Sequence, residues 1–121
     1  MEKVYSLSSG ELKCYGTYAI FDFTGHDYGV KEAEEFLAVL NTHYKNRTCV
    51  VISDRKLTKN INPEVYTAAR SQAIMGIAIV SEDAGVREEA IIEQSLFDGA
   101  FSFFTTMEDA IGWSKTVVKD A

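Results

Sequence analysis

The spacing of apolar residues changes part-way along this chain. Lys3 to Leu7, Glu11 to Tyr15 and Tyr18 to Phe23 read as strands, with the turn-forming residues Ser8-Ser9-Gly10 and Gly16 between them. Such short connections favour antiparallel pairing, because a parallel return needs a longer crossover. The N-terminal part therefore predicts a three-stranded antiparallel meander.

The middle of the chain predicts a helix followed by a covered strand. The helix runs from Val30 to Lys45, since its apolar positions share one helical stripe. That stripe consists of Ala33, Phe36, Leu37, Leu40 and Tyr44. Thr48 to Asp54 contains an unbroken apolar run, which is typical of a central strand covered on both faces.

Strands and helices alternate through the C-terminal half. Asn62-Pro63 begins a helix, because Asn caps well and Pro loses no needed hydrogen bond in a first turn. Gly76 to Ser81 is a second apolar strand, and Val86 to Phe97 is a further helix. Thr105 and Glu108 have capping-box spacing for a last helix. This alternation implies right-handed crossovers and parallel strands.

These elements predict one α/β domain over residues 1–121. Its mixed sheet has antiparallel N-terminal strands that continue into parallel βαβ units, with about four helices. A chain of 121 residues buries roughly two thirds of its unfolded surface, and 46% apolar with 25% charged residues is ordinary for a globular protein. The expected core includes Phe36, Leu40, Val51, Ile79 and Trp113.

Composition and charge narrow the functional class. A net charge of −6 opposes binding to nucleic acid, so Arg55, Lys56 and Lys59 are expected to be solvated loop charges. No signal-peptide pattern occurs, and no apolar run reaches the roughly 18 residues of a membrane-spanning helix, so we expect a cytoplasmic protein. Cys14 and Cys49 are expected to be buried, reduced thiols.

The sequence lacks the usual patterns of catalysis and cofactor binding. It has no Gly-x-Ser-x-Gly motif, phosphate-binding glycine loop or dinucleotide fingerprint. The loop around His26 offers too few metal ligands, and His43 suits the C-terminus of a helix. Glu88, Glu89 and Glu93 are expected to form a solvated helix face. We expect a protein that is not an enzyme and uses no cofactor or metal.

A first group of candidate residues follows the ends of the predicted parallel strands. Ser53, Asp54 and Arg55 leave the central strand, Glu82 leaves the next one, and Thr105 opens the last helix. Because ligands gather at the carboxyl ends of such strands, this rim would present Arg55 to an anion, held by Asp54 and Glu82. The alternative is a surface salt-bridge cluster, worth roughly 0–1 kcal/mol.

Residues 54–70 form a second candidate surface. The stretch from Asp54 to Asn62 is longer than a connection requires. Tyr66 and Arg70 share a helix face and are residue types enriched at interfaces. The alternative is that Tyr66 packs on the sheet edge. The predicted partner-binding residues are Arg55, Asn60, Asn62, Tyr66 and Arg70.

The order of these segments resembles the STAS-like domains, in the group named for the sporulation anti-sigma-factor antagonist (SpoIIAA-like). The resemblance extends to the CRAL-TRIO lipid-exchange superfamily and spans most of the chain. It rests on Tyr18-Ala19-Ile20-Phe21-Asp22, Val50-Val51-Ile52-Ser53-Asp54-Arg55, Asn62-Pro63-Glu64-Val65-Tyr66 and the Phe103-to-Trp113 ending. It implies the mixed-sheet fold without implying an activity.

Anti-sigma-factor antagonists carry an Asp-Ser-x-Gly element whose serine is phosphorylated. The matching stretch here, about Lys59 to Pro63, has no serine or threonine at that place, and Thr58 is the nearest hydroxyl. The resemblance therefore does not imply a phosphoserine switch in this chain.

Two functions are consistent with these observations. The first is a non-catalytic module that binds an unidentified protein partner through residues 54–70. The second is a small-molecule or lipid carrier, suggested by the CRAL-TRIO kinship and by aromatic residues. These are Tyr28, Phe97, Phe101, Phe103 and Phe104. Either function suits a monomer or a homodimer, because edge strands can pair between chains and Lys3 or Lys13 can block that pairing.

Overall fold

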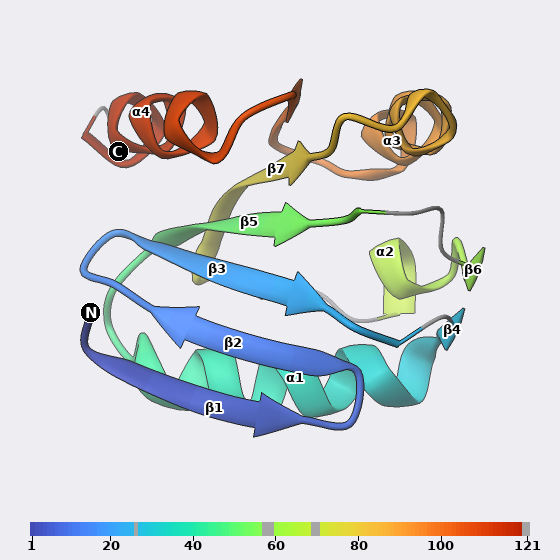
Figure 1. The fold of residues 1–121 in the computed structure, drawn as a ribbon. Coiled ribbons are helices and arrows are strands. Elements are labelled where there is room, and N and C mark those ends of the chain that lie inside the picture. Colours follow the sequence, from blue (N-terminus) through green and yellow to red (C-terminus); the bar gives the residue numbers. More distant parts are fainter. Residues whose placement is uncertain (26, 57–59, 69–70, 120–121) are drawn as a thin grey trace.

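The computed structural model describes the chain except for residues 26, 57–59, 69–70 and 120–121. Its main sheet has six strands in the order β1-β2-β3-β5-β7-β8 (Figure 1). They are β1 (Lys3–Leu7), β2 (Gly10–Cys14), β3 (Tyr18–Phe23), β5 (Cys49–Asp54), β7 (Ile74–Val80) and β8 (Ala100–Phe104). The first three pair antiparallel and the rest extend the sheet in parallel. The predicted mixed sheet is confirmed.

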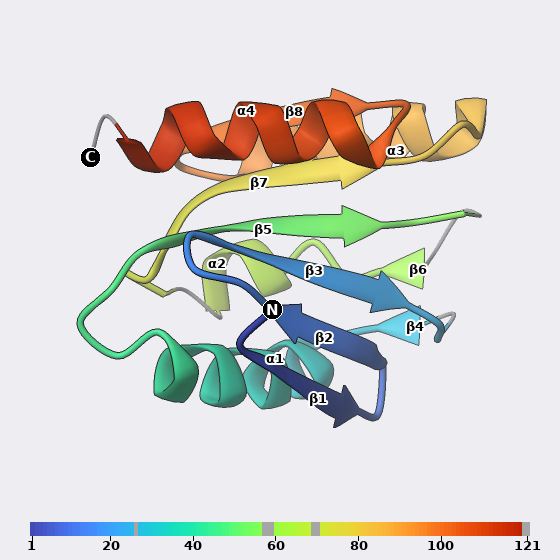
Figure 2. The same cartoon turned by 60° about the vertical axis from the view of Figure 1, so that its left-hand side comes forward.

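Helices cover both faces of this sheet. They are α1 (Val30–His43), the short α2 (Val65–Ala68), α3 (Ala84–Leu96) and α4 (Met107–Lys119). Val51 packs with Phe36 and Leu40 of α1 (the α1 cluster), and Ile77 packs against Val86 and Ala90 of α3 (the α3 cluster). Val51 and Ile77 are register partners. Since register partners point to the same face, α1 and α3 share one face of the sheet. Figure 2 shows α4 and α1 on different sides of the strands.

Side-chain alternation on the central strands separates the packed clusters. Val50 and Ile52 pack under α4, whereas Val51 packs under α1. This is the pattern expected of a parallel strand buried on both faces. Of the predicted core, Phe36, Leu40, Val51 and Ile79 are buried, and Trp113 is half-buried against the α4 cluster.

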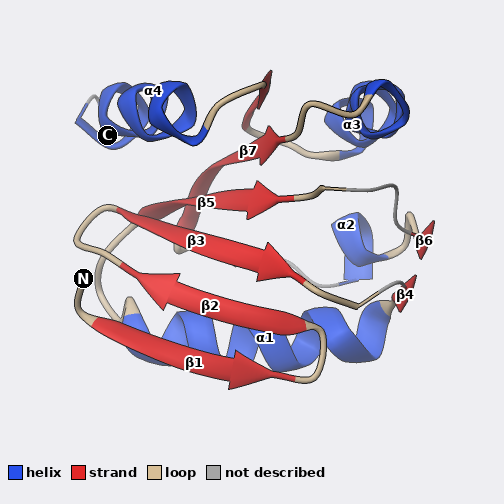
Figure 3. Ribbon diagram, in the orientation of Figure 1, coloured by secondary structure: helices blue, strands red, loops and turns tan. Residues whose placement is uncertain are grey.

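Two further strands lie apart from the main sheet (Figure 3). β4 (Asp27–Tyr28) and β6 (Asn60–Ile61) pair in parallel and form a second sheet. The sequence predicted only loops in these places. Two residues are too few to show a hydrophobic period, so nothing local distinguishes such strands from loops.

The sequence predicted N-terminal caps at Asn62 for α2 and at Thr105 for α4. The Asn62 carboxamide accepts a hydrogen bond from the backbone N–H of Glu64, as a cap would, although α2 itself begins at Val65. At α4, the hydroxyl that accepts from Asp109 N–H belongs to Thr106. The predicted cap at Thr105 was therefore wrong by one residue.

Two further findings concern the cysteines and the possibility of a membrane-spanning helix. Cys14 and Cys49 are buried and free, as predicted. Over the described residues, no helix combines the length and apolar character that crossing a membrane requires.

Candidate functional site

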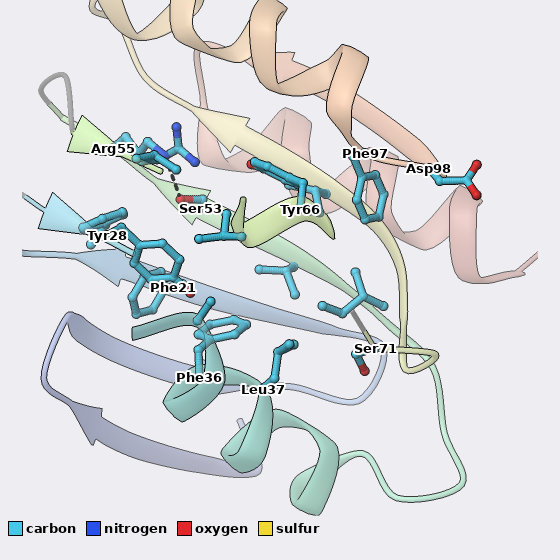
Figure 4. A pocket seen from close by; sticks show the side chains of 17 residues that line it. Phe21, Tyr28, Phe36, Leu37, Ser53, Arg55, Tyr66, Ser71, Phe97 and Asp98 are labelled. Carbon is cyan, nitrogen blue, oxygen red and sulfur yellow. Dashed lines mark hydrogen bonds between the residues drawn. The ribbon is translucent and has the colours of Figure 1, made fainter. Parts of the chain in front are cut away.

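A pocket of about 190 Å³ lies against the face of the sheet that carries α1 and α3 (Figure 4). Most of its wall is apolar and comes from elements far apart in the sequence. Among its lining residues are Phe21, Phe36, Leu37, Val51, Ile77 and Phe97. The pocket therefore depends on the assembled fold, because no single segment supplies its wall.

One end of the pocket is polar and closed. Arg55 and Ser53 line it and are only 4% and 6% exposed. The Arg55 guanidinium donates from Nη1 to Glu93 Oε2 at 2.5 Å and from Nη2 to Glu93 Oε1 at 2.8 Å. Its Nε donates to Ser53 Oγ at 3.2 Å, and the Tyr66 hydroxyl also donates to Glu93 Oε1. A bidentate buried ion pair thus lies beside an apolar cavity.

The local structure explains how these side chains meet. Ser53 shares its face of β5 with Val51, while Asp54 points to the other face. The Arg55 backbone N–H donates to Val80 O at 2.9 Å, so the strand pairing continues and Arg55 returns to the Ser53 face. The opposing carboxylate comes from α3, where Glu93 lies one turn beyond Ala90.

Glu93 was wrongly expected to lie on a solvated helix face. It is 6% exposed, because it continues the buried stripe of Val86 and Ala90 along α3. The spacing i, i+4, i+7 was present in the sequence and is the signal that would have placed Glu93 inward. The neighbouring Glu88 is exposed, as expected.

Electrostatics at this polar end favour a charged Arg55 and a neutral Tyr66. Burial lowers the pKa of Arg55, but the hydrogen bonds and charge of Glu93 outweigh it and raise that pKa above its usual value. Burial, and then the nearby Glu93 charge, raise the pKa of Tyr66, so its hydroxyl stays protonated and donates. Burial also raises the pKa of Tyr28, against a smaller opposing effect of the Arg55 charge.

The opposite end of the pocket reaches the surface. Asp98 is exposed there, and Leu37, Ser71 and Phe97 are half-buried. Figure 4 shows Asp98 and Phe97 at the side away from Arg55. The Ser71 hydroxyl donates to the Asn41 carboxamide oxygen on α1. A ligand that entered from the surface would therefore pass these polar and apolar residues before it reached Arg55.

The predicted anion rim is not assembled as expected. Ser53 and Arg55 line the pocket, but Asp54 lies on the other face of the sheet as the register partner of Asp22. Burial, with the Asp22 charge next, raises the pKa of Asp54. Glu82 and Thr105 are exposed. The expectation that Asp54 and Glu82 hold Arg55 was wrong, since Glu93 does so.

The predicted partner-binding residues are divided in the same way. Arg55 and Tyr66 line the pocket, whereas Asn62 is exposed and Asn60 contributes its backbone to β6. Partner binding by this segment stays a prediction. Expectations for His26, Thr58, Lys59 and Arg70 concern residues outside those that the structure describes.

The aromatic residues considered for a carrier lie in several places. Tyr28 and Phe97 line the pocket. Phe101 and Phe103 pack with α3 and do not line it, while Phe104 contacts Trp113, which packs against Ala110 of α4 (the α4 cluster). Only part of the aromatic content is therefore available to a ligand.

Comparison with known proteins supports the fold. A scan of protein-family models found no match, and neither did a search of curated proteins. A solved structure of an uncharacterised protein of the DUF3478 family from Shewanella loihica PV-4, described as having a SpoIIAA-like fold, is similar. It aligns with a TM-score of 0.60 and 12% identity over 93% of this chain and 90% of that one. The chain thus has the α/β fold of the SpoIIAA-like, or STAS-like, domains.

Proposed function

We propose that this protein binds a small, mainly apolar molecule in the pocket and does not catalyse its conversion. The observation that carries this proposal is a cavity of about 190 Å³ with a largely apolar wall and one polar end. An engineered apolar cavity of roughly 150 Å³ is enough to bind benzene. A pocket of this size suits a molecule built on one aromatic ring or a comparable aliphatic group.

The paired state of the buried charges supports a binding role over a catalytic one. A general base or nucleophile needs a carboxylate that can reach the reacting atom. The Glu93 carboxylate instead accepts hydrogen bonds from both Arg55 Nη atoms and from Tyr66. This arrangement positions groups around a ligand without leaving that carboxylate available for chemistry.

The inward direction of two expected interface residues favours the small-molecule function over partner binding. Tyr66 and Arg55 would have to be accessible from outside to anchor a protein partner. Both line the pocket instead, and Arg55 is 4% exposed. A partner would contact other parts of residues 54–70, such as the exposed Asn62.

The proposal is tested with ethylbenzene, followed by two-dimensional NMR and by thermal unfolding. Ethylbenzene is expected to shift the resonances of pocket residues such as Val51 and Ile77. At ten times its Kd it should add about 1.4 kcal/mol to the free energy of unfolding.

Two tryptophan variants locate the binding. Leu37→Trp replaces an aliphatic side chain of the pocket wall with a bulkier indole ring and should abolish the shifts. Ile91→Trp changes a residue that is 62% exposed on α3 and should leave them unchanged. Shifts scattered over the surface, or equal binding by Leu37→Trp and the wild type, would contradict the proposal.

A further inference from the structure

We propose that the ligand is uncharged and presents a hydrogen-bond acceptor, such as a carbonyl oxygen, to Tyr28 and Ser53 at the closed end of the pocket. This inference rests on the proposed function and specifies the chemistry of its ligand. It follows from the charge balance of the closed end and from its supply of donors and acceptors.

The charge balance argues against an anion. Arg55 is already neutralised by Glu93 through two hydrogen bonds, and both residues are buried. A carboxylate ligand would either displace Glu93 or add an unpaired negative charge to an apolar site, and both are unfavourable. A cation has no better site there, because the Glu93 carboxylate also accepts from Tyr66.

Two hydroxyl groups at this end can donate a hydrogen bond to a ligand. Ser53 Oγ accepts from Arg55 Nε, which leaves its own O–H to donate, and no described residue accepts from it. The Tyr28 hydroxyl likewise makes no hydrogen bond to another described residue. Figure 4 shows Tyr28, Ser53 and Arg55 together at one end of the pocket.

The acceptor at the same end is occupied. Both Glu93 oxygens accept from Arg55, and one of them also accepts from Tyr66. A ligand that brought only donors would find no equivalent partner among the described side chains at this end, whereas a ligand oxygen could accept from these hydroxyl donors. The remaining wall is apolar, so the rest of the ligand should be hydrocarbon.

The test compares acetophenone, ethylbenzene and benzoate at pH 7.5 by NMR titration. Acetophenone carries a carbonyl on the same ring, ethylbenzene has a similar shape without an acceptor, and benzoate carries a charge. In the wild-type protein, benzoate should bind at least tenfold more weakly than acetophenone. Tighter binding of benzoate would overturn the inference by showing an anion site.

The variant Tyr28→Phe separates the hydrogen bond from apolar burial. It should weaken acetophenone binding by about three- to tenfold, the usual effect of losing one hydrogen bond. Ethylbenzene binding should not change. The matched control Tyr18→Phe alters a tyrosine of the α4 cluster and should change neither affinity.

The outcomes also separate this inference from the proposed function. Ethylbenzene binding with an acetophenone affinity unaffected by Tyr28→Phe would overturn the inference and leave the proposed function standing. If neither neutral ligand binds the wild-type pocket, the proposed function fails and the inference fails with it.

Discussion

Arg55 and Glu93 show how strongly the properties of one residue depend on its surroundings. Both are charged types that usually lie at the surface, yet they are 4% and 6% exposed. Their bidentate geometry, supported by Ser53 and Tyr66, satisfies much of the hydrogen bonding that burial would otherwise leave unmet. Each therefore tolerates burial only because the other is present.

Removing one partner of this pair should destabilise the protein more than removing both. Glu93→Leu leaves the Arg55 charge buried and unpaired, which should cost about 3–5 kcal/mol. The double variant Arg55→Met with Glu93→Leu should lose less than half as much, because no buried charge remains. Urea denaturation measures both values, and a double variant as unstable as the single one would contradict this account.

A second residue-scale effect concerns acid stability at the N-terminus. Glu2 Oε1 accepts from Arg47 Nη2 at 2.9 Å and pairs with His43 Nε2 at 2.8 Å. The hydrogen bond from Arg47, followed by that from His43, lowers the pKa of Glu2 from 4.5 to about 2. Ionised Glu2 therefore stabilises the folded protein above pH 4.5, and this contribution disappears as the pH falls toward about 2.

The corresponding experiment follows unfolding of the wild type and Glu2→Gln from pH 6 to pH 2. The wild type should be more stable near neutrality, and the difference should shrink over the lower part of the range. Glu88→Gln, at an exposed position of α3, serves as the control. A difference that is constant with pH would show that the Glu2 carboxylate charge is not responsible.

At the scale of elements, apolar stripes account for most of the packing. α1 buries Ala33, Phe36 and Leu40 in succession, and α3 buries Val86 and Ala90. Each helix therefore turns its stripe toward the sheet, as period alone predicts. Apolar period alone does not predict burial of a charged residue that continues such a stripe, as Glu93 does in α3.

Truncation of the α1 stripe should be costly. Leu40 is fully buried, so Leu40→Ala should lower the free energy of unfolding by about 2–5 kcal/mol. Ile91→Ala, at a position 62% exposed, should change it by less than about 0.5 kcal/mol. Chemical denaturation of both variants checks this, and similar losses would mean that α1 does not pack as described.

At the scale of the whole molecule, the same sheet supports a sealed core and an open pocket. On the α4 face, Val50, Ile52, Ala78 and Val80 pack with Ala110 and are almost completely buried. On the other face, α1 and α3 lie over different strands. The pocket there is lined by residues of α1 and α2 and by Phe97 and Asp98, which follow the end of α3. The pocket therefore occupies a region of this face that neither long helix fills.

The rate at which cysteines react with a thiol reagent should distinguish buried positions from exposed ones. Cys14 and Cys49 are fully buried, and burial raises the pKa of Cys49 to about 12. A thiol reagent should therefore label them only as fast as the protein unfolds globally. A cysteine introduced by Ile91→Cys should react at once. Rapid labelling of the native protein without urea would contradict the packing of these two strands.

Much of the fold was predictable from local pattern, because period and turn chemistry depend on neighbouring residues. The three-strand meander, the parallel strands β5 and β7 and the long helices were expected, as were Leu40 and Val51 in the core. The resemblance to STAS-like domains agrees with the similarity of the fold to a SpoIIAA-like structure. Short strands such as β4 and β6 lie below the length at which a pattern can be recognised.

The pocket, by contrast, depended on contacts between distant segments. Arg55 and Glu93 are far apart in the sequence, and their pairing required α3 to pack on the face of the sheet to which Arg55 points just after β5. The sequence suggested Tyr28 for a carrier function and Tyr66 for partner binding. Only the folded structure brings both residues to one pocket. Local sequence determines which elements form, whereas the site arises from long-range packing, which determines which side chains meet and which are sheltered from water.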